Sequence, residues 1–524
     1  MDWTAGYASG VEYTSGFYRE QSPAYLNFVS ILNRCEPIPL DQPFTYFELG
    51  FGQGLTINLL AASNPQGQFY AADFTPAHVA NARQLANSAK LTNLTLLENS
   101  FAELAQGDVQ GLPQFDFITL HGIYSWVSPE SRQHMVDFIA RYLKPGGIVY
   151  VSYNAMPGWA AALPLQRLLM EHANLFPNDG LDKIMAGRAF LEKLTSTNAS
   201  YIQANPGLNF RLESITNNDA KYLVHEYLNN DWSALYHADV ARDMSQAKLD
   251  YIGSADLLSF YENLYLSEEK IQVLNTIPNA IVRETIKDYY LNNGFRKDVY
   301  TRGARMMSTL RQNDWIDRLG LALMIPRDRV SLKIKLGSGA VDAKPELYNP
   351  VLDLLAERPC SLSELKAMLF EKFQTNSDIL QIAAILMTGG IASIYFIPAP
   401  DNKLDDNHTN ATQQASQAIN RTIAWNARYG DEHRAFASPL LGNGVAMTIV
   451  ERMAYSVIAK QKSPDLGVKI ITEEITKLMK ETGVTFIKEG KRIESSEENI
   501  AFLEVQVIDI LKNRLPLWRQ LQLL

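Results

Sequence analysis

Short apolar runs alternate with helix-like stretches over residues 45–156. The apolar runs are four to six residues long and lie at 45–49, 67–72, 94–97, 115–120 and 148–152. Runs of this length are typical of buried strands, and the stretches at 55–62 and 130–143 have the composition of helices. Strands that alternate with helices predict an α/β fold, in which helices cover a mainly parallel sheet.

The pattern becomes helical from residue 157 and stays so to about 235. This change predicts a helical insertion in the α/β core. Residues 236–304 complete the core, with a helix and a strand expected over 239–253. The alternating stretch 295–302 is suited to the closing antiparallel strand.

Three further regions follow the predicted core. Residues 305–400 contain three short amphipathic helices, a Gly389-Gly390 break and an apolar strand, which predict a winged-helix-like domain. Residues 401–435 are polar and predict either a flexible linker or a polar helix. Helical periodicity resumes over 436–524 and predicts a helical C-terminal region.

The first predicted strand runs into three glycines at alternate positions, Gly50, Gly52 and Gly54. A strand, glycine turn and helix present backbone N–H groups and a helix N-terminus to a ligand. The spacing G-x-G-x-G is tighter than the G-x-G-x-x-G that suits a pyrophosphate. It indicates S-adenosylmethionine, with S-adenosylhomocysteine as the product, and Asp73 at the end of the second strand is placed to bind the ribose.

Residues beside these elements complete the predicted cofactor site. Glu48 precedes the glycines and Phe74 follows Asp73. Ser100 occupies the place where an acid often meets the adenine amine, and Phe101 is available to stack on the ring. We therefore expect all four to contact the cofactor.

A tyrosine-rich segment, residues 1–44, precedes the first strand. Tyr13 and Tyr18 belong to this segment. It could pack against the core or fold over the cofactor as a lid, and the pattern fits both. We include both tyrosines among the predicted cofactor-binding residues.

Candidate catalytic residues follow the fourth and fifth strands. His121 and Tyr124 come after the fourth strand, and Tyr153, Asn154 and Trp159 come at or after the end of the fifth. Carboxyl ends of strands are where an α/β sheet binds its ligands. Each residue also has a structural interpretation, since His121 could cap a turn and Trp159 could form part of the wall of the site. We predict an aromatic-lined channel that aligns an amine, because methyl transfer depends mainly on alignment.

Composition narrows the classes of partner. The chain has 524 residues, 46% hydrophobic and 20% charged, with a net charge of −9 and no Lys/Arg-rich block. We therefore expect no binding to nucleic acid, which normally requires a basic surface. The sequence contains no run of eighteen apolar residues and no signal-peptide pattern, so we expect no stable membrane insertion. Two widely spaced cysteines give no metal-ligand spacing and fit a cytoplasmic protein without a bound metal.

Several motifs together resemble a known family. They lie at 13–20, 48–54, 121–128, 153–159, 222–228 and 298–305. Residues 40–155 resemble a Rossmann-like class I methyltransferase core. The whole set is similar to bacterial methyltransferases with a methyltransferase regulatory domain, including rickettsial protein-lysine methyltransferases that modify outer-membrane proteins.

The resemblance has implications that go beyond the residue patterns. It implies a seven-stranded sheet whose last strand is antiparallel, an open central cavity, a dimerising insertion and hence a homodimer. It also implies in-line methyl transfer to lysine side chains of a protein substrate.

Two alternatives to a protein-lysine methyltransferase remain. One is a methyltransferase for a small metabolite or natural product, and the other is a cofactor-binding regulatory protein without turnover. An open cleft at the strand tips would favour a protein substrate, and a closed pocket would favour a small molecule. Basic residues on the presumed DNA-recognition helix would favour regulation, but residues 376–388 contain none.

Overall fold

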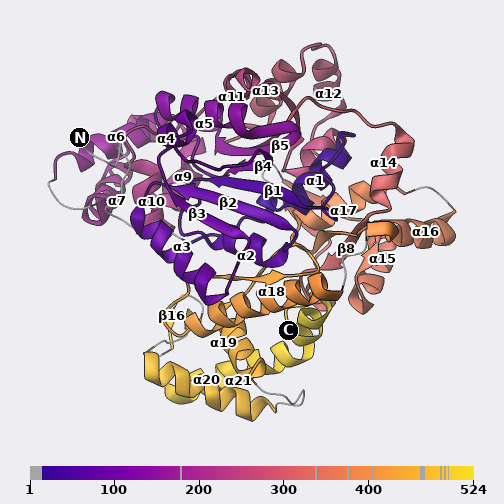
Figure 1. Ribbon diagram of the computed structural model, residues 1–524. Helices are drawn as coiled ribbons and strands as arrows, with labels where there is room; N and C mark the ends of the chain where they lie inside the picture. The colour runs from indigo at the N-terminus through magenta and orange to yellow at the C-terminus, as the bar shows by residue number, and fades with distance from the viewer. Residues whose placement is uncertain are drawn as a thin grey trace.

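The computed structural model describes residues 15–176, 180–336, 339–374, 377–402, 406–460, 467–483, 487–488, 491–493 and 495–524. Its centre is a seven-stranded sheet of order β3-β2-β1-β4-β5-β7-β6 (Figure 1). The strands are β1 (Phe44–Leu49), β2 (Gly67–Asp73), β3 (Leu94–Glu98), β4 (Phe115–Leu120), β5 (Leu143–Asn154), β6 (Leu249–Ser254) and β7 (Phe295–Arg302). The first five strands pair in parallel, and β7 lies antiparallel between β5 and β6. This confirms the predicted sheet and its antiparallel last strand.

Each strand sends alternate side chains to opposite faces of the sheet, as β geometry requires. Tyr46 of β1 joins the apolar cluster on one face, and Phe47 joins the cluster on the other. The first face is covered by α1 (Pro23–Leu32), α2 (Leu55–Ser63) and α3 (Pro76–Ser88). The second is covered by α4 (Phe101–Gln106), α5 (Pro129–Tyr142) and α11 (His237–Gln246). Two further helices, α12 (Glu268–Asn275) and α13 (Ala280–Leu291), connect β6 to β7.

A helical insertion leaves the core after β5, as the sequence predicts. It contains α6 (Leu163–Ala173), α7 (Gly180–Ser196), α8 (Ser200–Gln203), α9 (Asn209–Asn217) and α10 (Ala220–Tyr227), and has an apolar cluster of its own. Its two ends are held together by a clasp between 154–156 and Leu235. Within this clasp, the Leu235 N–H donates to the Asn154 carbonyl at 2.9 Å, and the Met156 N–H donates to the Leu235 carbonyl at 2.9 Å.

The region predicted as winged-helix-like forms around a three-stranded antiparallel sheet of order β11-β8-β12. Its elements are α14 (Thr309–Ile316), β8 (Leu319–Leu323), β9 (Lys333–Leu336), β10 (Gly339–Asp342), α15 (Pro345–Glu357), β11 (Cys360–Ser361), α16 (Leu362–Phe373), α17 (Ile379–Thr388) and β12 (Ala392–Phe396). The three predicted helices and the strand are present, while the winged-helix assignment stays a prediction. The presumed recognition helix α17 is almost entirely buried, so it presents no free face to a DNA groove.

The polar stretch 401–435 contains a helix, α18 (Asp406–Asn426), so the flexible-linker interpretation is wrong for most of it. α18 packs against α2, α19 and β13, where residues such as Ile419 and Ile423 are buried. The remaining elements are β13 (Ala435–Ser438), β14 (Asn443–Ala446), α19 (Ile449–Ile458), α20 (Val468–Thr482), β15 (Ile487–Lys488), β16 (Lys491–Arg492), α21 (Ser496–Asp509), a π-helix (Ile510–Arg514) and α22 (Leu515–Gln520).

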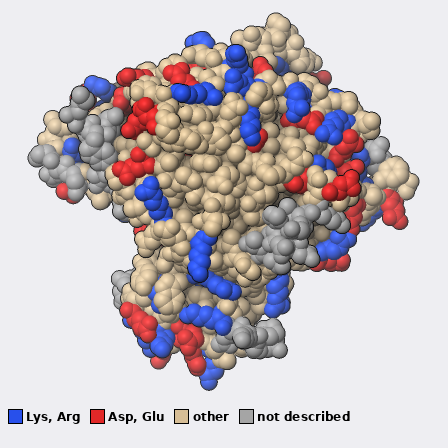
Figure 2. Space-filling model, viewed as in Figure 1, with Lys and Arg blue, Asp and Glu red and all other residues tan. Residues whose placement is uncertain are grey.

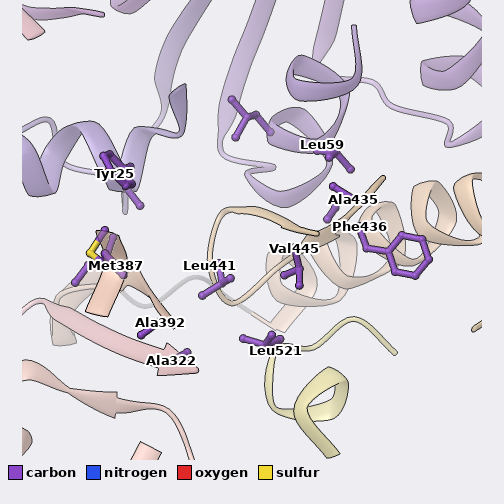
Figure 3. Close-up of a cluster of buried hydrophobic side chains, with 14 of the residues drawn as sticks. Tyr25, Leu59, Ala322, Met387, Ala392, Ala435, Phe436, Leu441, Val445 and Leu521 are labelled. Atoms are coloured by element: carbon purple, nitrogen blue, oxygen red, sulfur yellow. The ribbon is translucent and has the colours of Figure 1, made fainter. Parts of the chain in front are cut away.

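One continuous apolar core joins the α/β sheet to the later regions. Figure 3 shows Tyr25 of α1 and Leu59 of α2 facing residues from β12, β13 and the C-terminal segment, including Ala392, Phe436 and Leu521. All nine residues of α2 are buried, because the sheet covers one side of this helix and the C-terminal region covers the other. The helix that follows the glycine turn therefore depends on residues more than 350 positions later.

Acidic and basic side chains are interspersed over the face seen in Figure 2, around a wide uncharged area. Several basic side chains gather where the C-terminal helices meet the main body. None of the helices in the described part of the chain combines the length and apolar composition that a bilayer span requires.

The shared core leads to a prediction about stability. Phe436 is fully buried and packs edge-on against Tyr455, with ring centroids 4.6 Å apart. We expect Phe436→Ala to lower the free energy of unfolding by about 3–5 kcal/mol. Urea denaturation should show a lower midpoint for the whole molecule. Phe370→Ala is the control, because Phe370 is 48% exposed. An early transition limited to the C-terminal helices would contradict a shared core.

Candidate functional site

The loop between β1 and α2 adopts a backbone that favours glycine at three positions. Gly50, Gly52 and Gly54 have φ angles of 69°, 56° and 75°. A Cβ on Gly50 would lie 2.9 Å from Ile123, and one on Gly54 would lie 2.5 Å from the Cβ of Ala82. Both the backbone angles and the close neighbours therefore require glycine here.

Asp73 anchors this loop from the end of β2. Its carboxylate accepts hydrogen bonds from the Gly52 N–H at 2.9 Å and from the Thr75 N–H at 2.9 Å. The Nδ1 atom of His78 lies 3.2 Å from the same carboxylate. A carboxylate has about four acceptor positions, so Asp73 can fix the loop and still accept a hydroxyl from a ligand.

Glu48 is a second carboxyl at the tip of β1, and it is 3% exposed. The pKa of Glu48 is raised to about 8, mainly by burial; the Gln21 side chain acts in the opposite direction, and the nearby charge of Asp73 also raises it. Its Oε2 atom has no hydrogen-bond partner among the described residues. A buried, unpartnered carboxyl oxygen beside a glycine loop is suited to bind a cationic ligand.

These groups surround a pocket, the glycine-loop pocket, at the carboxyl ends of β1, β2 and β4. Predicted site residues in its wall are Tyr18, Glu48, Gly50, Gly52, Gly54, Asp73, Phe74, Phe101 and His121. The wall also contains Gly16, Phe51, Gln53, Thr56, Thr75, His78, Gly122, Ile123, Trp126 and Val127. Most of the second set follow the predicted residues by one or two positions, so they could have been found by extending each motif.

One predicted cofactor residue, Ser100, lies outside the pocket wall. Ser100 is the N-cap of α4, where its hydroxyl accepts from the Glu103 N–H and the Glu103 carboxylate accepts from the Ser100 N–H. This capping box occupies Ser100 and leaves Phe101 in the pocket wall. Tyr13 lies outside the described residues.

A second cavity, the insertion cavity, lies between the core and the helical insertion. It shares Tyr18, His121, Gly122 and Trp126 with the glycine-loop pocket. Its further wall residues are Ser125, Tyr153, Asn154, Pro157, Gly158, Ala160, Ala161, Ala162, Gly207, Leu208, Phe210, Arg211, Tyr222, Glu226, Asn292, Gly294 and Phe295. The two spaces therefore meet at one boundary.

His121 lies at this boundary. Its ring stacks on Tyr18 with centroids 3.6 Å apart, and its Nδ1 atom lies 2.8 Å from the Tyr150 hydroxyl. Burial lowers the pKa of His121 to about 3. The imidazole is thus neutral at physiological pH, and a cation that crosses this boundary meets no charge repulsion from it.

The insertion contributes two charged groups that the sequence did not single out. Glu226 of α10 accepts a hydrogen bond from the Asn154 amide at 3.2 Å. Arg211 of α9 lies over the Trp159 ring, 3.6 Å from its centroid. Glu226 falls within the motif 222–228, but only the folding of α10 back onto β5 reveals that it faces Asn154.

Three predicted catalytic residues have structural partners in the core. Tyr124 is fully buried outside both spaces, and its hydroxyl donates to Asp243 at 2.9 Å. Trp159 is 1% exposed and outside both spaces, with its indole N–H donating to the Gly294 carbonyl at 3.0 Å. Tyr153 reaches the insertion cavity, but its hydroxyl donates to Asp298 at 2.6 Å. These hydroxyl and indole groups therefore have hydrogen-bond partners within the protein, and the catalytic role of the three residues stays a prediction.

Comparison with known proteins identifies two family matches. A family model described as a methyltransferase domain matches residues 47–149, and one described as a predicted methyltransferase regulatory domain matches residues 219–302. The second segment includes α10, with Glu226, and strands β6 and β7. In this fold it completes both the sheet and the insertion cavity.

Relatives and a solved structure match longer parts of the chain. An uncharacterised protein of Synechocystis sp. is 36% identical over 521 residues, which cover 99% of each chain. An uncharacterised protein of Rickettsia prowazekii is 27% identical over 221 residues, covering 42% of this chain and 85% of its own. The structure of PKMT2 from Rickettsia typhi in complex with AdoHcy has a TM-score of 0.67 at 18% identity. That match covers 95% of this chain and 98% of PKMT2, so the two share a fold over nearly their whole length.

S-adenosylmethionine is the cofactor, and the glycine-loop pocket fits it. The glycines allow close approach of the backbone, the unpartnered oxygen of Glu48 suits a cation, and Phe74 and Phe101 offer rings for the adenine. When bound, the cofactor supplies a methyl group on a sulfonium. In the part of the chain that is described, no three His, Cys, Asp or Glu side chains come together as a metal-binding group.

The anchoring role of Asp73 generates the first binding prediction. Asp73→Ala should weaken S-adenosylmethionine binding by at least about tenfold, because a hydrogen bond to a charged group contributes about 1.5–3 kcal/mol. Calorimetric titration measures this affinity. Asp116→Asn is the control, since Asp116 binds Thr45 and Lys144 at the opposite end of the sheet. Equal affinity of Asp73→Ala and the parent protein would contradict the placement.

Glu48 generates a prediction about pH. At pH 7 the free protein holds a proton on Glu48, whose pKa is about 8, and a bound cation should displace it. Affinity for S-adenosylmethionine should therefore rise as pH increases from 6 to 8. Calorimetry at pH 7 in phosphate and in Tris should show proton release on binding, and Glu48→Gln should abolish it.

Glu48→Gln also tests how the raised pKa of Glu48 makes the stability of the protein depend on pH. Between pH 4.5 and 8 the unfolded protein has lost the Glu48 proton and the folded protein keeps it. The stability of the cofactor-free protein should fall as pH rises through this window. Glu48→Gln should flatten the dependence, and an unchanged slope would contradict the raised pKa.

Proposed function

The chain belongs to the S-adenosylmethionine-dependent methyltransferases with a methyltransferase regulatory domain, and we propose that it methylates lysine side chains of a protein substrate. The observation that carries this proposal is the insertion cavity, which meets the glycine-loop pocket at His121 and contains the buried carboxyl of Glu226. A lysine side chain is an apolar stem with a cationic tip. The apolar and aromatic residues of the wall suit the stem, and Glu226, the one acid among the described wall residues, suits the tip.

The boundary between the two spaces favours a direct transfer. Tyr18 and His121 stack there, and Gly122 leaves the passage open because it lacks a side chain. Transfer from a sulfonium requires the acceptor in line with the methyl group. An amine that enters through the insertion cavity reaches the cofactor from one defined side.

The openness of the site favours a protein over a small metabolite. A third space, the outer cleft, lies between α3, the insertion and the segment that follows α18. It shares Gln53 with the glycine-loop pocket and Tyr222 with the insertion cavity. A polypeptide in the outer cleft would have access to the glycine-loop pocket and to the insertion cavity. Such access is expected from the resemblance to rickettsial protein-lysine methyltransferases.

We also propose that the insertion mediates a homodimer. Its helices α6 and α7 and the turn between them expose Leu175 at 74% and Met185 at 51%. Exposed apolar side chains on adjacent helices are typical of association surfaces.

Substrate class can be tested directly. The protein is incubated with S-adenosylmethionine labelled on its methyl group and a bacterial lysate, and labelled protein is hydrolysed for amino-acid analysis. We expect label in methyllysine. Label in a small metabolite would support the small-molecule alternative, and absence of transfer would support a binding protein without turnover.

Asn154 gives a prediction about turnover. Asn154→Ala should lower the methylation rate about 10- to 100-fold, because it removes a hydrogen bond to the Glu226 carboxyl. Cofactor affinity should change little. Tyr124→Phe is the matched control, since it removes the hydrogen bond to Asp243 outside the cavity. An Asn154→Ala enzyme that turns over like the parent protein would place the acceptor elsewhere.

A further inference from the structure

Glu226 is a buried carboxyl without an ion-pair partner among the described residues. It is 4% exposed, and among the described residues no Lys, Arg or His nitrogen lies within 4.0 Å of it. Two buried acids of the core are paired, Asp298 with Arg296 at 2.9 Å and Glu284 with Lys287 at 2.8 Å, whereas the unpaired Glu48 lies in the wall of the glycine-loop pocket. Burial of an unpaired carboxyl is unfavourable for folding, so its position in the cavity wall points to a ligand.

We propose that Glu226 accepts the proton that a substrate ammonium must lose before methylation, and that the Asn154 amide holds its carboxylate in the cavity. This inference rests on the proposed function and assigns the base that an amine acceptor requires. Glu226 reaches the cavity from the insertion, whereas the cofactor lies on the core. The insertion would thus deprotonate the substrate amine, and the core would position the cofactor.

The electrostatic setting suits this role. Burial raises the pKa of Glu226 to about 7, and the Arg211 charge and the Asn154 hydrogen bond act in the opposite direction. A general base works best when its pKa lies near the working pH. The same desolvation lowers the pKa of an ammonium from about 10.4. The difference between the pKa values of the ammonium and of Glu226 therefore becomes smaller.

The proposed step balances in charge and atoms. An N–H bond of the ammonium breaks, an O–H bond forms on Glu226, and the lone pair stays on nitrogen. The N–C bond then forms as the C–S bond breaks and its electron pair goes to sulfur. The product carries the positive charge that the sulfonium loses, and Glu226 returns its proton to solvent through the cavity.

His121 and the tyrosines near Glu226 stay in one form near neutrality. His121 is neutral because its pKa is about 3, and burial raises the pKa values of Tyr153 and Tyr222. Tyr227, next to Glu226 on α10, also has a raised pKa. α6 and α7 pack against α10 mainly through apolar residues such as Leu165 and Leu191. Among these groups, Glu226 is therefore the one whose pKa lies between 6 and 8.

A spectroscopic titration tests the assignment without turnover. Infrared difference spectra of the full-length protein with bound S-adenosylhomocysteine are recorded from pH 5 to 9. A protonated-carboxyl band with a midpoint near 7 should be present in the parent protein and in Glu213→Gln, whose site is exposed on α9. It should be missing in Glu226→Gln. Glu48 titrates separately, and Glu48→Gln identifies its band.

A lysine side-chain mimic extends this titration. Added n-butylammonium should lower the midpoint of the Glu226 band, because a cation beside the carboxyl favours its charged form. A band that survives Glu226→Gln, or a midpoint that n-butylammonium leaves unchanged, would overturn the proposal. This outcome is independent of whether methyllysine is found in the lysate experiment, which tests the proposed function itself.

Kinetics separate proton transfer from a structural role. With the labelled lysate protein as substrate, Glu226→Gln should lose about 10²- to 10⁴-fold in rate at pH 7. The loss should shrink above about pH 9.5, as the amine deprotonates on its own, and Glu226→Asp should retain part of the rate. An equal loss at every pH, or no loss, would contradict the proton-acceptor role.

Discussion

The glycine-loop pocket depends on one hydrogen bond, which the Gly52 N–H donates to the Asp73 carboxylate. This bond ties the turn after β1 to the end of β2, so the glycines keep their left-handed backbone and α2 begins at a fixed point. α2 is in turn enclosed by α18, β13 and β14. The geometry of a short loop is thus supported by the C-terminal region, and a binding pocket in the first 130 residues needs the whole chain for its rigidity.

The site is assembled from two parts with different chemistry. The core contributes backbone N–H groups and two acids at the strand ends, one of them protonated at neutral pH. The insertion contributes Arg211 and Glu226 on helices that face β5. Between them lies a neutral stack of Tyr18 and His121. Charged groups therefore lie on both sides of the boundary, and the stacked pair at the boundary itself is neutral.

Local patterns predicted the elements that local geometry determines. The glycine spacing, Asp73 and the order of strands follow from turn chemistry and alternation within a few residues. The sequence did not reveal that Tyr124 and Trp159 face partners inside the protein, because the residues that follow a strand lose its two-residue period. Ser100 was misplaced because a capping serine and a ligand-binding serine occur in the same position before a helix. Glu226 could not be found, since its meeting with Asn154 joins residues 72 positions apart through tertiary packing.

The clasp between Leu235 and residues 154–156 brings the two ends of the insertion side by side. The segment from Pro157 to Ala234 therefore leaves the core and returns to it at the same place, between β5 and α11. Its length and sequence can change during evolution without moving the strands that hold the cofactor. Arg211, Tyr222 and Glu226 all lie in this segment. These three wall residues of the insertion cavity therefore belong to a single segment, separate in the sequence from the strands that form the glycine-loop pocket.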